Sequence, residues 1–143
     1  MKNPLDVGTK TIDAATIHCI RPLPPERTAT LNTEKKFAYE IRTINGDGAF
    51  VEAGISLEKL VAGFAKIGEE LTLLASGEAV RKDWIASVKD FASRPGQPAK
   101  YNSVVKFTHP ENGRTAEEWL TAKRDQIVGT TQKLDDLAGG PKG

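Results

Sequence analysis

A histidine, a cysteine and an arginine lie close together near the start of the chain, and these side-chain types can take part in covalent chemistry. His18 is followed directly by Cys19, and Arg21 lies three residues beyond His18. A neutral imidazole is a nucleophile near pH 7, and a neighbouring guanidinium can pair with an anionic group. His18 and Arg21 are therefore the candidate catalytic pair, with a hydrogen-bonded histidine in a strand as the alternative interpretation.

The same residues do not form the pattern of a metal site or of a cysteine nucleophile. The chain has two histidines, His18 and His109, and one cysteine, and they lack the regular spacing of zinc ligands. Neighbouring residues of a strand point to opposite faces, so we expect His18 and Cys19 to lie apart. No Gly-rich phosphate loop is present either. The pattern predicts no metal, no cofactor and no enzyme activity.

The charge of the chain narrows the class of partner. Lys and Arg total 20 and Asp and Glu total 19, so the formal net charge is +1. This balance excludes a chain built as a whole to coat nucleic acid or to attach to a membrane through basic residues. No run approaches the roughly 18 apolar residues of a membrane helix, and the N-terminus lacks the apolar core of a signal peptide. We therefore expect a cytoplasmic protein whose partner is a protein, not nucleic acid or a membrane.

Apolar periodicity predicts the elements that position these residues. β-Branched and apolar residues predict a strand at 16–20, and alternation predicts strands at 37–44 and 71–75. Asn45-Gly46 predicts a hairpin that pairs 37–44 with a strand at 49–53. Helical spacing predicts a helix capped by Ser56 and a second helix over 78–92. The first of these helices has an apolar face made of Leu57, Leu60, Val61 and Phe64.

The C-terminal third is expected to form a smaller unit. Pro95 and Pro98 interrupt the chain, a strand is expected at 103–108, and Thr115 with Glu118 forms a capping-box pattern that predicts a following helix. These boundaries divide the chain into a tail at 1–13, a domain at 14–94, a linker at 95–102, a strand–helix extension at 103–138 and a disordered tail at 139–143.

Residues 37–92 resemble HPr, the phosphocarrier protein of the bacterial sugar phosphotransferase system. The stretch Ile55–Leu60 is similar to the opening of the family's second helix, Gly68–Leu73 to the strand that follows, and Ala75–Gly77 to the turn before the last helix. The resemblance implies an α+β fold in which an open-faced antiparallel sheet packs under helices, here with a C-terminal strand–helix extension.

The resemblance also implies functional residues. HPr proteins carry phosphate on a histidine within Gly-Leu-His-x-Arg-Pro-Ala, and His18, Arg21 and Pro22 match that motif only with one inserted residue. The other register places Pro24 at the histidine position. Ser56 aligns with a serine that a regulatory kinase phosphorylates in some HPr proteins, and helix capping is its alternative role. The family's partner surface lies partly on the matching helix, here Leu57, Leu60, Val61 and Phe64.

The predicted function is non-enzymatic protein–protein recognition or regulation on an HPr-like scaffold. Two alternatives stay open: an active histidine phosphocarrier that uses His18, and a structural subunit of a phage particle or other assembly. Polar arms at 1–15 and 94–143 suggest the second alternative, because a homo-oligomer could form through them.

Overall fold

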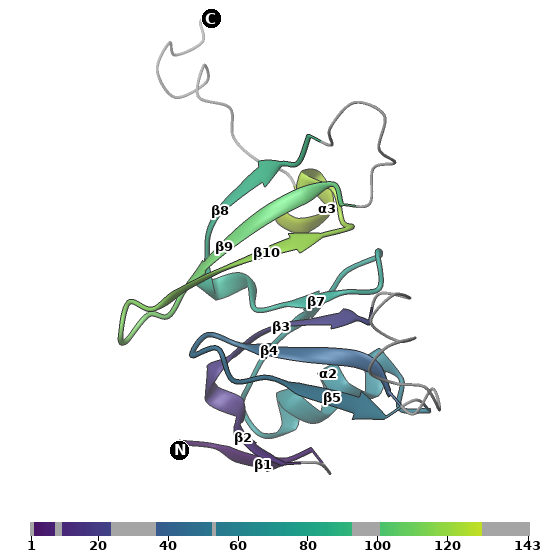
Figure 1. Ribbon diagram of the computed structural model, residues 1–143, viewed down its shortest axis with the longest axis vertical. Coiled ribbons are helices and arrows are strands. Elements are labelled where there is room, and N and C mark those ends of the chain that lie inside the picture. The colour runs from purple at the N-terminus through teal and green to yellow at the C-terminus, as the bar shows by residue number, and fades with distance from the viewer. Residues whose placement is uncertain (1, 8–9, 24–36, 53, 93–100, 130–143) are drawn as a thin grey trace, which may run out of the picture.

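The structure of the protein is a computed structural model, and it describes residues 2–7, 10–23, 37–52, 54–92 and 101–129 (Figure 1). Within these residues the chain forms three antiparallel sheets. The five-stranded sheet contains, in spatial order, β5 (Ala49–Glu52), β4 (Phe37–Thr43), β3 (Ile17–Pro22), β7 (Ala79–Val80) and β6 (Thr72–Leu73). The three-stranded sheet contains β10 (Thr115–Leu120), β9 (Ser103–Thr108) and β8 (Ile85–Asp90), and the two-stranded sheet contains β1 (Pro4–Asp6) and β2 (Thr11–Asp13).

The helical elements of the described residues are short. They are α2 (Leu57–Lys66), α3 (Arg124–Val128) and the 3-10 turns η1 (Ala14–Thr16) and η2 (Lys82–Trp84). None of the helices in this part of the chain has the length and apolar character needed to cross a membrane.

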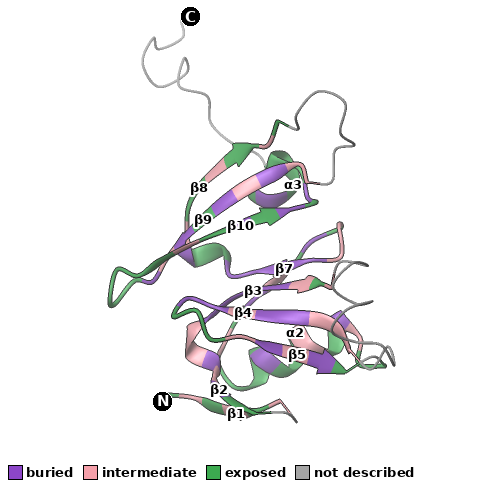
Figure 2. Cartoon of the chain, in the orientation of Figure 1, coloured by how far each residue is buried: buried purple, intermediate pink, exposed green. Residues whose placement is uncertain are grey.

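Two hydrophobic cores lie on opposite faces of the five-stranded sheet. Figure 2 shows buried residues in this sheet and in the three-stranded sheet. The first core lies between this sheet and α2, and contains Ile20 and Phe64. The second core lies between the five-stranded and the three-stranded sheets, and contains Cys19 and Phe107. Since side chains alternate along a strand, β3 supplies residues to both cores.

An irregularity in β3 changes which side chains face the second core. The pairing of β3 with β4 shifts between Ile17 and Cys19, so His18 is an extra residue at a β-bulge. As a result, Ile17 and Ile20 both belong to the first core although they are three residues apart. His18 contacts Phe107 and Cys19 packs in the second core, so both face the three-stranded sheet. The expectation that His18 and Cys19 point to opposite faces is wrong.

The predicted α+β fold of the HPr type is also wrong, because the structure is rich in sheet and the largest sheet packs on both faces. Residues 78–92, expected to form one helix, contain β7, η2 and β8. A bulge in β8 between Ile85 and Ser87 lets Ile85 and Val88 both pack against the second core. A three-residue spacing of apolar residues is also typical of a helix, and this coincidence explains the error.

The helix predicted after the capping-box pattern is replaced by a strand over its first residues. In β10 the buried residues Glu118 and Leu120 alternate with the exposed residues Glu117 and Trp119. Because the charged residue Glu118 occupies an inward position, the sequence of this segment lacks the apolar–polar alternation by which a strand is recognised. The only helix in the described part of this segment is α3, with five residues.

The remaining predicted elements that fall in the described residues are confirmed. β3, β4, β5, α2, β6 and β9 lie where the sequence predicts them, and the β4–β5 hairpin turns through Gly46 with φ of 87°. β8 lies within the expected domain at 14–94 but pairs with β9, which lies within the expected extension at 103–138. The tail at 139–143 and residues 95–100 of the expected linker lie outside the described residues.

The tight approach of the β4–β5 turn to β4 generates a prediction. A Cβ on Gly48 would lie 2.8 Å from the carbonyl oxygen of Ile41, so Gly48→Ala should lower the free energy of unfolding by about 1–3 kcal/mol. Gly63→Ala is the matched control, because its Cβ meets no atom within 4 Å and alanine favours a helix interior. Urea unfolding of both variants checks this: a Gly48→Ala protein as stable as Gly63→Ala would contradict the described turn.

Candidate functional site

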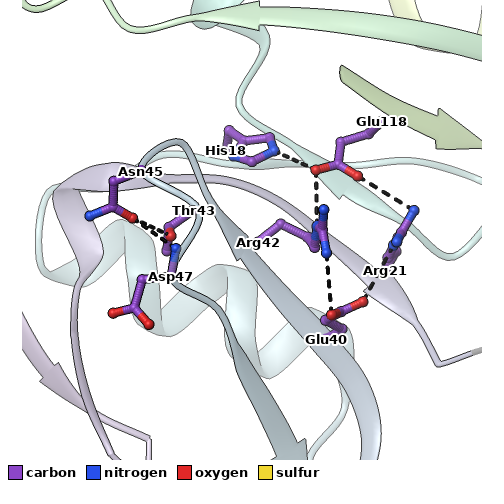
Figure 3. Close-up of polar contacts among 8 residues, drawn as sticks. All are labelled: His18, Arg21, Glu40, Arg42, Thr43, Asn45, Asp47 and Glu118. Atoms are coloured by element: carbon purple, nitrogen blue, oxygen red, sulfur yellow. Dashed lines mark hydrogen bonds and ion pairs between the residues drawn. The ribbon is translucent and has the colours of Figure 1, made fainter. Parts of the chain in front are cut away.

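His18 lies at one end of a group of charged side chains that centres on Glu118, between the two larger sheets (Figure 3). Its side chain is 1% exposed, and its Nε2 atom lies 2.7 Å from Oε2 of Glu118 in β10. An ionised carboxylate can only accept a hydrogen bond, so Nε2 carries the proton in this pair. The His18 ring also packs against Phe107, with 4.8 Å between the ring centroids.

Two arginines from the five-stranded sheet complete the surroundings of Glu118. Nε of Arg42 donates to Oε2 of Glu118 at 3.0 Å, and Nη1 of Arg21 lies 3.4 Å from Oε1 (Figure 3). Both arginines also pair with Glu40, at 3.4 Å from Arg42 and 3.6 Å from Arg21. The two guanidinium groups and two carboxylates balance in charge, which is what burial of such a group requires.

These contacts shift the ionisation of the groups in predictable directions. Burial alone would raise the pKa of Glu118, but the hydrogen bond from His18 and the positive charge of Arg42 hold the pKa of that carboxyl below its usual value. Burial opposes the charged form of Arg42 too, yet the charge of Glu118 raises the pKa of the guanidinium. Glu118 therefore stays ionised when buried.

Cys19, the neighbour of His18, lies in an environment that makes its thiol unreactive. Its side chain is fully buried, and burial together with the charge of Glu118 raises the pKa of the Cys19 thiol well above its usual value. A thiol that stays protonated is a poor nucleophile. No group of three potential metal ligands occurs among the residues that the structure describes.

The geometry around His18 favours packing over phosphoryl transfer. The HPr resemblance implies a histidine at a helix start, where backbone N–H groups bind the phosphoryl oxygens. His18 lies instead inside β3, under the three-stranded sheet, and Arg21 pairs with Glu40 and Glu118. A phosphoryl donor would have to displace β10 to reach Nε2. The observed contacts support a structural role for both predicted catalytic residues.

A third buried carboxylate, Glu78, was not predicted from the sequence and joins the same two sheets. Glu78 is 2% exposed and accepts hydrogen bonds from the backbone N–H groups of Thr121 at 2.9 Å and Ala122 at 3.1 Å, and from the hydroxyl of Ser76 at 2.7 Å. Nearby, Arg81 donates to the carbonyl oxygen of Ile17 at 2.6 Å. The sequence offers one indication of these two buried charges: Glu78 and Arg81 stand directly on either side of the apolar pair 79–80.

Ser56 caps α2 as the sequence predicts. Its hydroxyl oxygen accepts a hydrogen bond from the backbone N–H of Lys59 at 3.2 Å, and its backbone is extended as an N-cap requires. The cap accounts for the serine at this position without a regulatory role.

The four residues expected to bind a partner divide into two pairs. Leu57 and Phe64 are each 3% exposed and belong to the first core, and Phe64 also lies in the lining of the hollow described next. Leu60 and Val61 are only partly buried against that core. Of these two, Leu60 lines a hollow beside α2.

That hollow is an apolar groove between α2, β5 and the β1–β2 hairpin, with a volume of about 410 Å³. Leu5 and Val7 form the wall on the hairpin side, and Ile41 and Val51 belong to its floor. Ile55 and Ile67 also line it and are 40% and 41% exposed. The hairpin side of the groove was not predicted, although Leu5 and Val7 alternate with Asp6 in the expected tail. We call this hollow the α2 groove.

Comparisons with known proteins give no relative from which a function could be carried over. Family models, curated proteins and solved structures were each compared with the chain, and no match was found in any of the three. The resemblance to HPr therefore stays a prediction that no comparison tests, and the function must be argued from the site.

The buried charges predict a large effect of one substitution. Glu118→Gln should lower the free energy of unfolding at pH 7 by about 3 kcal/mol, because Arg21 and Arg42 lose a buried counter-charge. Glu117→Gln is the matched control on the same strand, and because Glu117 is exposed its effect should stay within about 0.5 kcal/mol. Chemical denaturation of the two variants measures both values.

The pH dependence of stability gives a second readout of the same prediction. Since folding lowers the pKa of Glu118, its contribution is complete above the ordinary glutamate pKa of about 4.3 and is lost as the pH falls through the lower folded value. Stability of the native sequence should therefore fall more steeply below pH 4 than that of Glu118→Gln. Parallel curves would contradict the assignment.

The cap of α2 predicts a smaller effect. Ser56→Ala should lower the free energy of unfolding by about 1 kcal/mol, because the Lys59 N–H loses its acceptor. Ser56→Asp keeps an acceptor and places a negative charge at the helix start, so its stability should stay within about 0.5 kcal/mol of the original. Thermal unfolding compares the three proteins, and an alanine variant as stable as the aspartate variant would argue against the cap.

Proposed function

We propose that this protein is a non-enzymatic binding module that holds a segment of another protein in the α2 groove. The observation that supports this function is the continuity between groove and core: Ile41 and Val51 are 1% and 4% exposed, yet both belong to the groove lining. An apolar side chain entering the groove would therefore pack directly on the first core.

The groove also exposes apolar surface that a partner could cover. Ile55 and Ile67 each keep about two-fifths of their surface in water, and Leu60 between them is partly buried. A contiguous apolar hollow of this kind is typical of an interaction site, whereas single exposed apolar residues are ordinary.

The charges at the groove favour a partner segment with a basic residue. Glu52 is exposed and contributes a carboxylate to the lining, where a basic residue of a partner could pair with it. Complementary charge speeds association and selects the partner more than it adds affinity.

The described contacts give less support to the alternatives. The phosphocarrier alternative lacks access to His18, as described above. The structural-subunit alternative depends on free terminal arms, but the N-terminal arm is bound to its own chain: the side-chain amide of Asn3 donates to Ile67 and Glu69, and Lys2 pairs with Glu111. These contacts hold the hairpin beside α2 and so help to form the groove.

Selection of peptides from a random display library on the folded protein tests this proposal. We expect enriched peptides to combine apolar residues with lysine or arginine. The double variant Ile55→Gln, Ile67→Gln should bind them at least about tenfold more weakly, because two apolar contacts are lost. The fold should tolerate these changes, since neither residue belongs to either hydrophobic core and each is about two-fifths exposed.

Val128→Gln is the matched control, because Val128 is 37% exposed but lies in α3, away from the groove. This variant should bind the enriched peptides with unchanged affinity. Failure to enrich any peptide, or equal weakening by the control and the double variant, would contradict the proposed function.

A further inference from the structure

The strand at one end of the five-stranded sheet borders the α2 groove. β5 pairs with β4 on one side, and no other strand of the described residues pairs with it on the other side. An edge strand presents unpaired backbone N–H and C=O groups along its open side, and these can pair with an added strand.

The open side of β5 and the apolar groove are adjacent. Val51 and Glu52 of β5 line the groove together with Leu60 of α2 and Leu5 of the hairpin. Figure 1 shows the β1–β2 hairpin beyond β5, on the side away from β4, and the two hairpin strands pair only with each other among the described residues. Backbone hydrogen-bonding groups and an apolar hollow therefore occur together between β5 and the hairpin.

We infer that the partner segment binds as an extended strand added to the edge of β5, with alternate side chains entering the α2 groove. This inference rests on the proposed function and specifies the binding mode. In this mode the main-chain hydrogen bonds supply affinity and the pockets for alternate side chains supply specificity. An added strand continues the sheet under α2, where its apolar side chains meet Leu60 and the exposed part of Ile55.

The same geometry describes the partner segment. Side chains of a strand repeat every two residues, so its apolar residues stand at i and i+2. A lysine or arginine beside them can pair with Glu52, an exposed carboxylate of the groove. A second copy of this chain that paired through its own β5 would bring a second Glu52 to the contact, so a basic segment of a different protein fits better.

The test uses the full-length protein, two synthetic peptides of equal composition and two N-methylated forms of the first peptide. The first alternates valine with threonine between terminal lysines, and the second has its valines at helical spacing, i, i+3 and i+4. The two N-methylated forms repeat the first peptide with N-methyl groups on alternate amides. One form carries them on the odd-numbered amides and the other on the even-numbered amides. Fluorescence anisotropy of labelled peptides measures their affinity.

We expect the alternating peptide to bind at least about tenfold more tightly than the helical one, since only the strand matches the edge. N-methylation should abolish binding in one form, where the methylated amides face β5, and leave it in the other. Glu52→Lys should weaken binding about tenfold through repulsion of the lysines, whereas Glu58→Lys, on the exposed side of α2, should not.

The outcomes that overturn the inference are separable from failure of the proposed function. Equal binding of the helical peptide, or tolerance of N-methylation in both forms, would show a groove that binds without strand addition. Absence of binding by every designed peptide would also overturn strand addition, while the library selection decides independently whether the groove binds at all. A concentration-dependent dimer in sedimentation velocity that competes with the peptide would assign the edge to a second copy instead.

Discussion

Burial of the Glu118 carboxylate is the constraint on which the packing of the two larger sheets depends. A buried carboxylate is costly unless charged or polar groups surround it, and all of its partners, His18, Arg21 and Arg42, belong to the five-stranded sheet. Another placement of the three-stranded sheet would leave the Glu118 carboxylate without these partners, whereas Arg21 and Arg42 would keep Glu40 of their own sheet. The face of the five-stranded sheet that packs on the three-stranded sheet is therefore unavailable to a partner. The proposed binding site lies on the α2 side, at the open edge of β5.

The fold could be predicted where one hydrophobic period dominates a segment. The alternation over 37–44, the Asn-Gly turn and the amphipathic face of α2 each have one physical interpretation, and each is confirmed. Prediction failed where bulges changed the period: Ile85 and Val88 imitate helical spacing because an extra residue lies between them. Prediction failed again in β10, because the charged residue Glu118 occupies an inward position at which a strand pattern is expected to show an apolar residue.

The candidate site was predictable only in part, because its chemistry depends on long-range contacts. His18 was identified as unusual from its type, but its partner Glu118 lies 100 residues away and no local pattern joins them. Ser56 was assigned correctly, since an N-cap is a local feature. The α2 groove required the hairpin wall, and the contact of Leu5 with the region of α2 follows from tertiary structure rather than from any pattern within residues 1–13.

Native-state amide hydrogen exchange tests the dependence of the two sheets on each other most directly. If the buried charges unite them into one cooperative unit, the amides at the centre of β9 and those of β3 should open with the same free energy, that of global unfolding. The native protein should show equal opening free energies for β9 and β3, and Glu118→Gln should show unequal ones. Exchange of β9 at clearly lower free energy than β3 in the native sequence would contradict it.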